Sequence, residues 1–353
     1  MKNQQKVLNG ISVPVMLLDN ELRIALANNA AFASFPSLQT GESLGKLGEL
    51  DRDIETLLQT TLARRGATSL TIVTNETFQR EFLISVKTVT DLEQFAAPTL
   101  VLTFEDQTPL RIAKSMRSDF VANVSHEIRS PLTAISGFVE TLQGDGKDDP
   151  EAGKLFLGLM EKEVARMTNL VSDLLSLSKV EAKESRAPKK PLNLNQTIHQ
   201  AVESVTALAR KRGKHLDCKV VPDLPTVLGK RDDLARALIN LLENAINYSR
   251  EGSTITVTAQ AAPNGNPLNM PAVFVSVRDQ GEGIPAREIP RLTERFYRID
   301  KSRSRNVGGT GLGLAIVKHI LVRHRGVLTI NSTLGTGSTF TAYLPVAAPQ
   351  QKK

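Results

Sequence analysis

The chain has 353 residues, of which 41% are hydrophobic and 23% are charged, as is usual for a globular protein of two or three domains. No run of 18 apolar residues and no leader-like beginning is present, so we expect neither a membrane-spanning helix nor a signal peptide. The single cysteine excludes an internal disulfide bond and fits a reducing, cytoplasmic location.

The positive charge is unevenly distributed along the chain. The formal net charge is +7 overall, with −3 in residues 1–105, 0 in residues 106–190 and +10 in residues 191–353. The C-terminal part is therefore expected to bind an anionic ligand. Nucleic acid is the competing interpretation of a basic domain, but there is no recognition-helix signature or aromatic platform, so we expect no nucleic-acid partner.

Residues 1–105 predict a small α+β module. Its short alternating strands are typical of antiparallel sheets with one solvent-facing side. The pattern from Val15 to Phe32 resembles the beginning of PAS sensory domains. All five histidines and Cys218 lie outside this module, so we do not expect a histidine-held haem or a cysteine-bonded flavin. The strands are expected at Val13–Leu18, Arg23–Leu26, Leu70–Val73, Glu81–Lys87 and Thr99–Phe104, with a helix before the first and another over Asn28–Phe35.

Residues 106–184 predict two long amphipathic helices, over about 106–142 and 151–184, with a glycine- and aspartate-rich break between them. One such hairpin has too small a core to stand alone. Two hairpins should therefore pair into a four-helix bundle, which makes the protein a homodimer. Residues 185–191 read as a linker.

The first of these helices contains His126 beside Glu127, with Pro131 five residues after the histidine. Proline removes a helix hydrogen bond and usually bends the axis, which suits a histidine that has to be presented to another group. A lone histidine on a helix is more often a surface or packing residue. The motif gains weight only from the nucleotide-binding pattern that follows.

Residues 192–347 predict a mixed α/β domain, and residues 348–353 a tail. Two polar features suggest a ligand. Asn240 and Asn244 share one helix face, and their amide oxygens suit Mg²⁺ held beside phosphates. Asp279 follows an apolar strand, where its carboxylate can accept a hydrogen bond from the amine of adenine. The expected helices are 194–213 and 231–249, and the expected strands are 215–221, 254–260, 273–279, 327–332 and 338–344.

Glycine turns complete this pattern. Gly281 and Gly283 would let the backbone approach a ring closely. The run from Gly308 to Leu314 begins an apolar helix, and its N–H groups could bind phosphates. A dinucleotide-binding turn would follow a strand, whereas this run follows a basic loop. The last turn is Gly335–Phe340. The asparagine pair, the turn after Asp279, the glycine run and the last glycine turn are each weak signals alone. The four in this order are a specific pattern.

The C-terminal region resembles the GHKL-type ATP-binding domain that sensor histidine kinases share with DNA gyrase and MutL. With Ser125–Leu132 upstream, residues 108–346 resemble a sensor histidine kinase, and the stretch from Arg117 to Glu127 is most similar to the phosphate-regulon sensor branch. The resemblance implies a multidomain α+β protein that uses ATP and Mg²⁺. It would phosphorylate itself on a histidine and pass the phosphoryl group to an aspartate of a response regulator.

The resemblance also implies roles for individual residues. His126 would be the phosphoacceptor, Glu127 would orient its ring and take its proton, and Asn244 with Asn240 would hold Mg²⁺. Residues 284–309 would form a lid over the nucleotide, with seven basic side chains, of which those nearest the glycine run are expected to contact phosphate. The ATP-binding set would be Asn240, Asn244, Tyr248, Asp279, Gly281, Gly283, Arg298, Lys301, Gly309, Thr310, Gly311, Leu312, Gly313 and Thr339.

Two positions depart from the family pattern. Asn247 stands where a cation is frequent, and Ser130 stands where relatives that dephosphorylate their regulators have threonine or asparagine. Serine keeps the hydroxyl but lacks the methyl group that fixes the threonine rotamer in a helix, so we expect weak regulator phosphatase activity.

Three rival interpretations are less favoured. An ATP-hydrolysing relative would have a carboxylate at Asn240 to activate water. A pseudokinase would bind ATP without transferring phosphate, but His126, Glu127, Asn244 and Asp279 are all present. A structural coiled-coil hairpin would not need the glycine turns. Many relatives carry membrane helices upstream, so the chain could be a soluble kinase or the cytoplasmic part of a membrane sensor.

Overall fold

The computed structural model describes residues 2–44, 53–74, 80–89, 99–144, 149–181, 187–300 and 309–347. The chain forms two compact units, Met1–Val121 and Ala122–Lys353, and the boundary lies inside a long helix, α4. Within the described parts of the chain, every helix falls short of the length or apolar content that crossing a bilayer requires.

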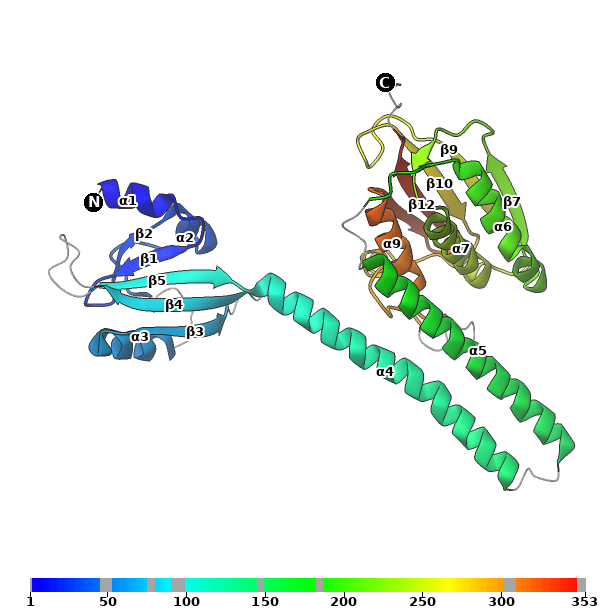
Figure 1. Ribbon diagram of the computed structural model, residues 1–353, viewed down its shortest axis with the longest axis horizontal. Coiled ribbons are helices and arrows are strands. Elements are labelled where there is room, and N and C mark those ends of the chain that lie inside the picture. The colour runs from blue at the N-terminus through cyan, green and yellow to red at the C-terminus, as the bar shows by residue number, and fades with distance from the viewer. Residues whose placement is uncertain are drawn as a thin grey trace. The chain divides into compact units, whose positions relative to one another are not determined.

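The first unit contains a five-stranded antiparallel sheet in the order β2-β1-β5-β4-β3 (Figure 1). Alternation decides its faces: Phe82, Ile84 and Val86 point into the core, whereas Ser85 and Lys87, on either side of Val86, are exposed. Phe35, Phe82 and Phe104 pack with ring centroids 5.1 to 6.3 Å apart. The five expected strands are confirmed as β1 (Val15–Leu18), β2 (Ile24–Ala27), β3 (Ala67–Val73), β4 (Glu81–Val89) and β5 (Thr99–Asp106).

Three helices accompany this sheet: α1 (Lys2–Asn9), α2 (Asn29–Ser34) and α3 (Asp53–Arg64). Residues of α2 and α3 join the main core, and Leu8 of α1 packs on the opposite face of the sheet. Asn28 caps α2 by accepting from the Ala31 N–H at 2.9 Å, and it is fully buried. The sequence analysis did not predict α3, because its buried stripe is short, with Ile54 and Leu58 as its apolar anchors.

The helical hairpin is confirmed as α4 (Thr108–Gln143) and α5 (Pro150–Glu181). Pro131 lies inside α4 without ending it. Along α5 only a few side chains near the C-terminal end, such as Leu170 and Leu177, are buried. Large apolar side chains of the hairpin are therefore exposed in the single chain: Leu110, Ile112, Val121, Leu132, Val139, Leu155, Leu157, Val164, Val171 and Leu175.

The C-terminal domain is a second five-stranded sheet, in the order β11-β12-β10-β9-β7, with helices packed on one face (Figure 1). All neighbouring pairs are antiparallel except β7 and β9. The expected elements are confirmed to within about two residues at each end. They are α6 (Leu194–Lys211), β7 (His215–Val220), α7 (Arg231–Tyr248), β9 (Thr254–Ala261), β10 (Ala272–Arg278), α9 (Gly313–Arg323), β11 (Val327–Thr333) and β12 (Gly337–Pro345).

A small ladder and a short 3-10 turn complete the domain. The ladder pairs β6 (Pro191–Leu192) with β8 (Val227–Leu228), and the turn is η2 (Ile289–Arg291). Pro191 was assigned to the linker at residues 185–191, but its pairing with Leu228 places the end of that segment in the domain.

His324, at the C-terminal end of α9, joins this helix to the start of α7. Its ring is 3% exposed. Nε2 accepts a hydrogen bond from the backbone N–H of Lys230 at 3.1 Å, so Nδ1 carries the proton and donates to the carbonyl of Ile320 at 2.7 Å. Burial lowers the pKa of His324, although the Ile320 carbonyl and Asp233 act in the opposite direction. The ring is therefore held neutral.

The neutral ring of His324 predicts how the free energy of unfolding changes with pH. The unfolded chain binds a proton near the ordinary histidine pKa of about 6.5, whereas the folded chain resists it. Stability is therefore fully present above that pH and falls as pH decreases toward the lowered folded pKa. We expect His324→Gln to flatten the decline between pH 7 and pH 5 in denaturant unfolding. His199→Gln, on an exposed position of α6, should keep the wild-type slope; an unchanged slope for His324→Gln would contradict the assignment.

Candidate functional site

His126 is exposed on α4, and Glu127 beside it is half-buried. The Glu127 carboxylate is held by two arginines: its Oε2 accepts from Nη2 of Arg166 on α5 at 3.0 Å and from Nη2 of Arg298 at 3.2 Å. Both arginines are well covered, with side-chain exposures of 14% and 6%. The contacts of Glu127 therefore run to the second helix and to the nucleotide domain. Its role in orienting the His126 ring stays a prediction.

This contact changes what was expected of Arg298. Sequence analysis predicted it to be an ATP ligand in the lid, and the structure places its guanidinium on Glu127. Arg166 was not singled out at all, because an arginine on an amphipathic helix has no local signature. Only the packing of α4 against α5 brings it to Glu127.

Asp279 is the most constrained polar side chain of the site. It follows β10, is 4% exposed, and its Oδ1 accepts from the backbone N–H groups of Gly281 at 2.8 Å and Ser338 at 3.1 Å. Burial raises the pKa of this carboxyl, and the two N–H groups act against that shift. The carboxylate thus fixes its own turn and the beginning of β12.

The glycines of these turns are required by close backbone contacts. A Cβ at Gly281 would lie 2.5 Å from the carbonyl oxygen of Tyr248. Gly283 has φ +74° and a Cβ there would lie 2.1 Å from the Thr333 oxygen, and at Gly337, with φ +126°, 2.2 Å from the Asp279 oxygen. No other residue fits these positions without moving the backbone.

The asparagine face of α7 lies against the beginning of α9. Asn240 is 7% exposed, and its Nδ2 donates to the carbonyl of Gly313 at 3.3 Å, whereas Asn244 is half-buried. Glu243, next to Asn244, has a pKa raised by burial; Arg236 acts to lower it and Asp173 to raise it. Asn240 and Asn244, the two predicted metal ligands, therefore lie on the same side of α7 as Arg236 and Glu243.

The predicted phosphate turn leads directly into α9. Gly311 has φ +73°, and its carbonyl accepts from the Phe296 N–H at 2.9 Å, so the turn is held against the lid segment. The Thr310 Oγ1 accepts from the Leu312 N–H at 3.2 Å and donates to Asp173 of α5 at 2.7 Å. Gly313, at the end of this turn, lies beside Asn240. Asp173 is a neighbour that sequence analysis missed.

Tyr248 and Thr339, also predicted to bind ATP, and two lid arginines are more exposed than Asp279 and Asn240. Tyr248 is 40% exposed at the end of α7, and Thr339 is half-buried in β12, paired with Arg278 and Asn331. In the lid, Arg287 and Arg291 have exposures of 85% and 55%, which fits solvated charges. The remaining predicted lid residues, Lys301, Arg303, Arg305 and Gly308, lie outside the described residues.

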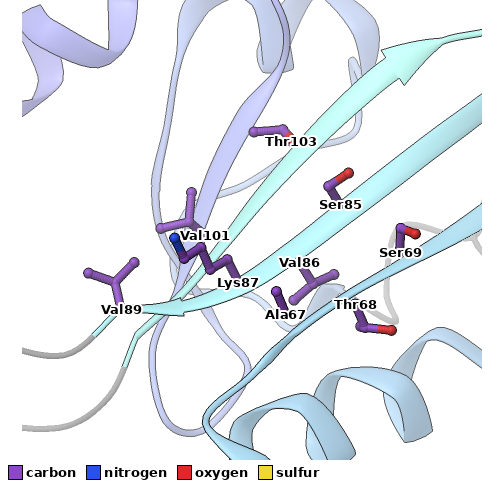
Figure 2. Close-up of a pocket in the computed structure, with 9 residues that line it drawn as sticks. All are labelled: Ala67, Thr68, Ser69, Ser85, Val86, Lys87, Val89, Val101 and Thr103. Atoms are coloured by element: carbon purple, nitrogen blue, oxygen red, sulfur yellow. The ribbon is translucent and has the colours of Figure 1, made fainter.

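The first unit has a separate hollow on the sheet face opposite α2 and α3. Figure 2 shows Lys87 there as the one charged side chain, beside Val89 and Val101. The face is continuous with the small cluster under α1, since Val101 also packs with Leu17. The other lining residues are Ala67, Thr68, Ser69, Ser85, Val86 and Thr103.

The glycine contacts make a testable contrast. Gly283 and Gly335 both have positive φ, at +74° and +79°, but a Cβ at Gly335 meets nothing within 4 Å. Gly335→Ala should cost about 1–2 kcal/mol of stability, the usual penalty for a left-handed alanine. Gly283→Ala adds the collision with Thr333 and should cost about 3–4 kcal/mol. Denaturant unfolding of both variants measures the difference, and equal losses would show that the turn yields easily.

The helical hairpin and the C-terminal domain each match a known protein family. Residues 116–183 match the His Kinase A (phospho-acceptor) domain, and residues 229–348 match the histidine kinase-, DNA gyrase B- and HSP90-like ATPase domain. This supports ATP as the nucleotide of the C-terminal domain. Among the described residues, no group of three or more histidine, cysteine, aspartate or glutamate side chains could hold a metal ion.

Relatives that match about 70% of this chain agree with these domain matches. The phosphate regulon sensor protein PhoR of Pseudomonas aeruginosa is 40% identical over 247 residues, which are 70% of this chain and 54% of PhoR. The sensor-like histidine kinase SenX3 of Mycolicibacterium smegmatis is 36% identical over 248 residues, 69% of this chain and 62% of SenX3. The chain thus spans between about half and two thirds of these relatives.

A solved structure shares the fold across nearly the full length. The histidine kinase ThkA, in complex with response regulator protein TrrA, superimposes with a TM-score of 0.53 at 22% identity, covering 98% of this chain and 99% of that one. With the two domain matches and the sequence relatives, the conclusion is direct: the chain belongs to the sensor histidine kinases.

Proposed function

We propose that this protein is an ATP-dependent histidine kinase that phosphorylates itself on His126 and then passes the phosphoryl group to an aspartate of a response regulator. One observation carries the proposal. The exposed histidine and the nucleotide domain are connected directly, because Glu127 beside His126 bonds to Arg298 of the lid at 3.2 Å. The reacting side chain and the predicted nucleotide site thus lie within one compact unit.

The chemistry requires little covalent work from the protein, since phosphoryl transfer depends mainly on positioning and charge neutralisation. A neutral imidazole nitrogen of His126 attacks the γ-phosphorus of ATP. The bond from that phosphorus to the bridging oxygen breaks, and ADP leaves. Glu127 takes the proton from the other ring nitrogen once its arginine partners allow the approach. The product is a phosphohistidine, which can transfer its phosphoryl group to a carboxylate.

Nucleotide recognition is assigned to three parts of the C-terminal domain. The bonds of the Asp279 carboxylate to Gly281 and Ser338 are made by Oδ1, so we assign the adenine amine to Oδ2. The N–H groups of the turn from Gly309 to Gly313, at the beginning of α9, would bind the phosphates. Tyr248 would lie beside the nucleotide.

The donor set on α7 fits Mg²⁺ bound together with nucleotide phosphates. The Nδ2 of Asn240 donates to the Gly313 carbonyl, so its Oδ1 is not used in that bond and could bind the ion. Asn244 follows one helical turn later on the same face. Amide oxygens are ligands that Mg²⁺ accepts alongside phosphate and water. When bound there, the ion would neutralise phosphate charge. Asn240 and Asn244 would fix its place relative to the turn.

The exposed apolar side chains of α4 and α5 support a homodimer. Among the described residues ten large ones are exposed in the single chain, among them Leu155, Leu157 and Leu175. A second hairpin would cover them and complete a four-helix bundle. The N-terminal α+β unit would then be a PAS-like sensory module carried by each α4 helix.

A second activity is dephosphorylation of the regulator. Ser130 is exposed on α4 four residues after His126, so the two side chains share a helix face. Its hydroxyl could position a water molecule against a phosphoaspartate. Because serine fixes this hydroxyl less firmly than threonine, we expect this activity to be weak.

The first test is chemical labelling. Incubation with γ-labelled ATP and Mg²⁺ should give a wild-type chain whose label is lost in acid and stable in alkali, as for a phosphohistidine. His126→Ala should carry none, because the attacking nitrogen is gone. His199→Ala removes another exposed histidine and should label like wild type. Wild-type labelling of His126→Ala would overturn the acceptor assignment.

The second test concerns the adenine contact. In Asp279→Asn the amide oxygen can still accept from Gly281 and Ser338, so the fold should be kept. A charge-assisted hydrogen bond is worth about 1.5–3 kcal/mol, so ATP affinity should fall by about 10- to 100-fold. Calorimetric titration measures this, with Asp232→Asn on the exposed first turn of α7 as control. Unchanged affinity in Asp279→Asn would place adenine elsewhere.

A further inference from the structure

Asp173 of α5 makes two polar contacts with the nucleotide domain. Its Oδ1 accepts from Nη2 of Arg236 on α7 at 2.5 Å, and its Oδ2 accepts from Oγ1 of Thr310 at 2.7 Å. The carboxylate is 14% exposed and the arginine 35%, so solvent screens this pair only in part. The phosphotransfer hairpin therefore places a negative charge on the nucleotide domain.

The position of this charge is the significant point. Thr310 belongs to the turn proposed to bind phosphates. Arg236 lies one helical turn before Asn240, whose side chain bonds to Gly313 at the end of the same turn. Asp173 thus lies at the edge of the proposed phosphate site although it belongs to another domain. It accepts hydrogen bonds from the Thr310 hydroxyl and the Arg236 guanidinium, two donors that could otherwise bind an anionic ligand. The Nε of Arg236 has no hydrogen-bond partner among the described residues.

We propose that Asp173 competes with the phosphates of ATP for the glycine turn. The carboxylate and a phosphate group seek the same donors, and two anions there repel each other. Binding of ATP would then detach α5 from Thr310 and Arg236, and docking of α5 would in turn weaken ATP binding, since such coupling is reciprocal. The inference rests on the proposed nucleotide site and adds to it a control on ATP affinity by the hairpin.

Two further ion pairs define the surface that would be released. Glu181, two turns after Asp173 on α5, accepts from Arg295 at 2.6 Å and lies 3.4 Å from Nε2 of His319 on α9. Glu127 on α4 accepts from Arg298. In each pair the hairpin supplies the carboxylate and the nucleotide domain supplies the cation. Asp173 differs because only it contacts the phosphate turn.

The test uses the full-length chain and compares three ligands. Dissociation constants for ATP, ADP and adenosine are measured by displacement of a fluorescent nucleotide. Asp173→Asn keeps the shape and removes the charge, so ATP and ADP should bind about five- to tenfold more tightly, within the usual range of coupling. Adenosine lacks phosphates, so its affinity should not change. Glu161→Gln, exposed on the same helix, should match wild type for all three.

A double-mutant cycle tests the sign of the interaction. Arg236→Gln removes a donor that the phosphates would take over from Asp173 and leaves the Asp173 charge beside Thr310, so ATP should bind more weakly than to wild type. Adding Asp173→Asn to Arg236→Gln should recover most of that loss, because the repelling charge is then absent. An arginine that served only as a direct phosphate ligand would give no such recovery, which would overturn the proposal.

The remaining outcomes separate the two proposals. If wild type binds ATP and becomes labelled from it, but Asp173→Asn binds ATP no more tightly or gains equally for adenosine, the competition is wrong and the kinase proposal stands. If wild type binds no ATP, the kinase proposal fails as well. Hydrogen exchange of the wild type supplies a measurement independent of any variant: ATP should speed exchange in residues 171–181, and unchanged exchange would contradict release of α5.

Discussion

A buried carboxylate at the end of β10 is the constraint on which the C-terminal domain depends. Asp279 would be costly to bury without partners, and it meets this cost with two backbone N–H groups from different parts of the chain. These bonds fix the turn at Gly281 and the start of β12 at Ser338. The close approaches at Gly283 and Gly337 follow, because the backbone leaves no room for a side chain. These contacts fix the backbone around the carboxylate that is proposed to bind adenine.

The second organising feature is the junction between the hairpin and the nucleotide domain. Three carboxylates of α4 and α5 meet cations of the C-terminal domain, at Glu127, Asp173 and Glu181. Partly exposed ion pairs contribute little stability individually, often less than about 1 kcal/mol. Such a junction is suited to forming and breaking, as a kinase requires when its nucleotide domain has to approach the acceptor and then leave it.

The junction also changes how the basic charge of the C-terminal part is understood. Composition alone suggested that its net charge of +10 served an anionic ligand. Part of that charge is used within the molecule: Arg236, Arg295 and Arg298 are paired with carboxylates of the hairpin. Under the competition proposed above, the phosphates of ATP would compete with Asp173 for one of these cations, Arg236.

The sequence by itself determined the elements, the glycine turns and the residues of the proposed chemistry. Periodic apolar patterns are local, so α4, α5 and nearly every strand could be placed to within a few residues, and the short stripe of α3 was too weak a signal. The asparagines of α7 and the aspartate after β10 could be identified because their spacing carries the signal. Only the tertiary structure decided the partners of charged side chains. Arg166 and Asp173 are ordinary residues in sequence, and Arg298 was expected at the nucleotide instead. Packing brings these residues to partners 39 to 171 residues away along the chain.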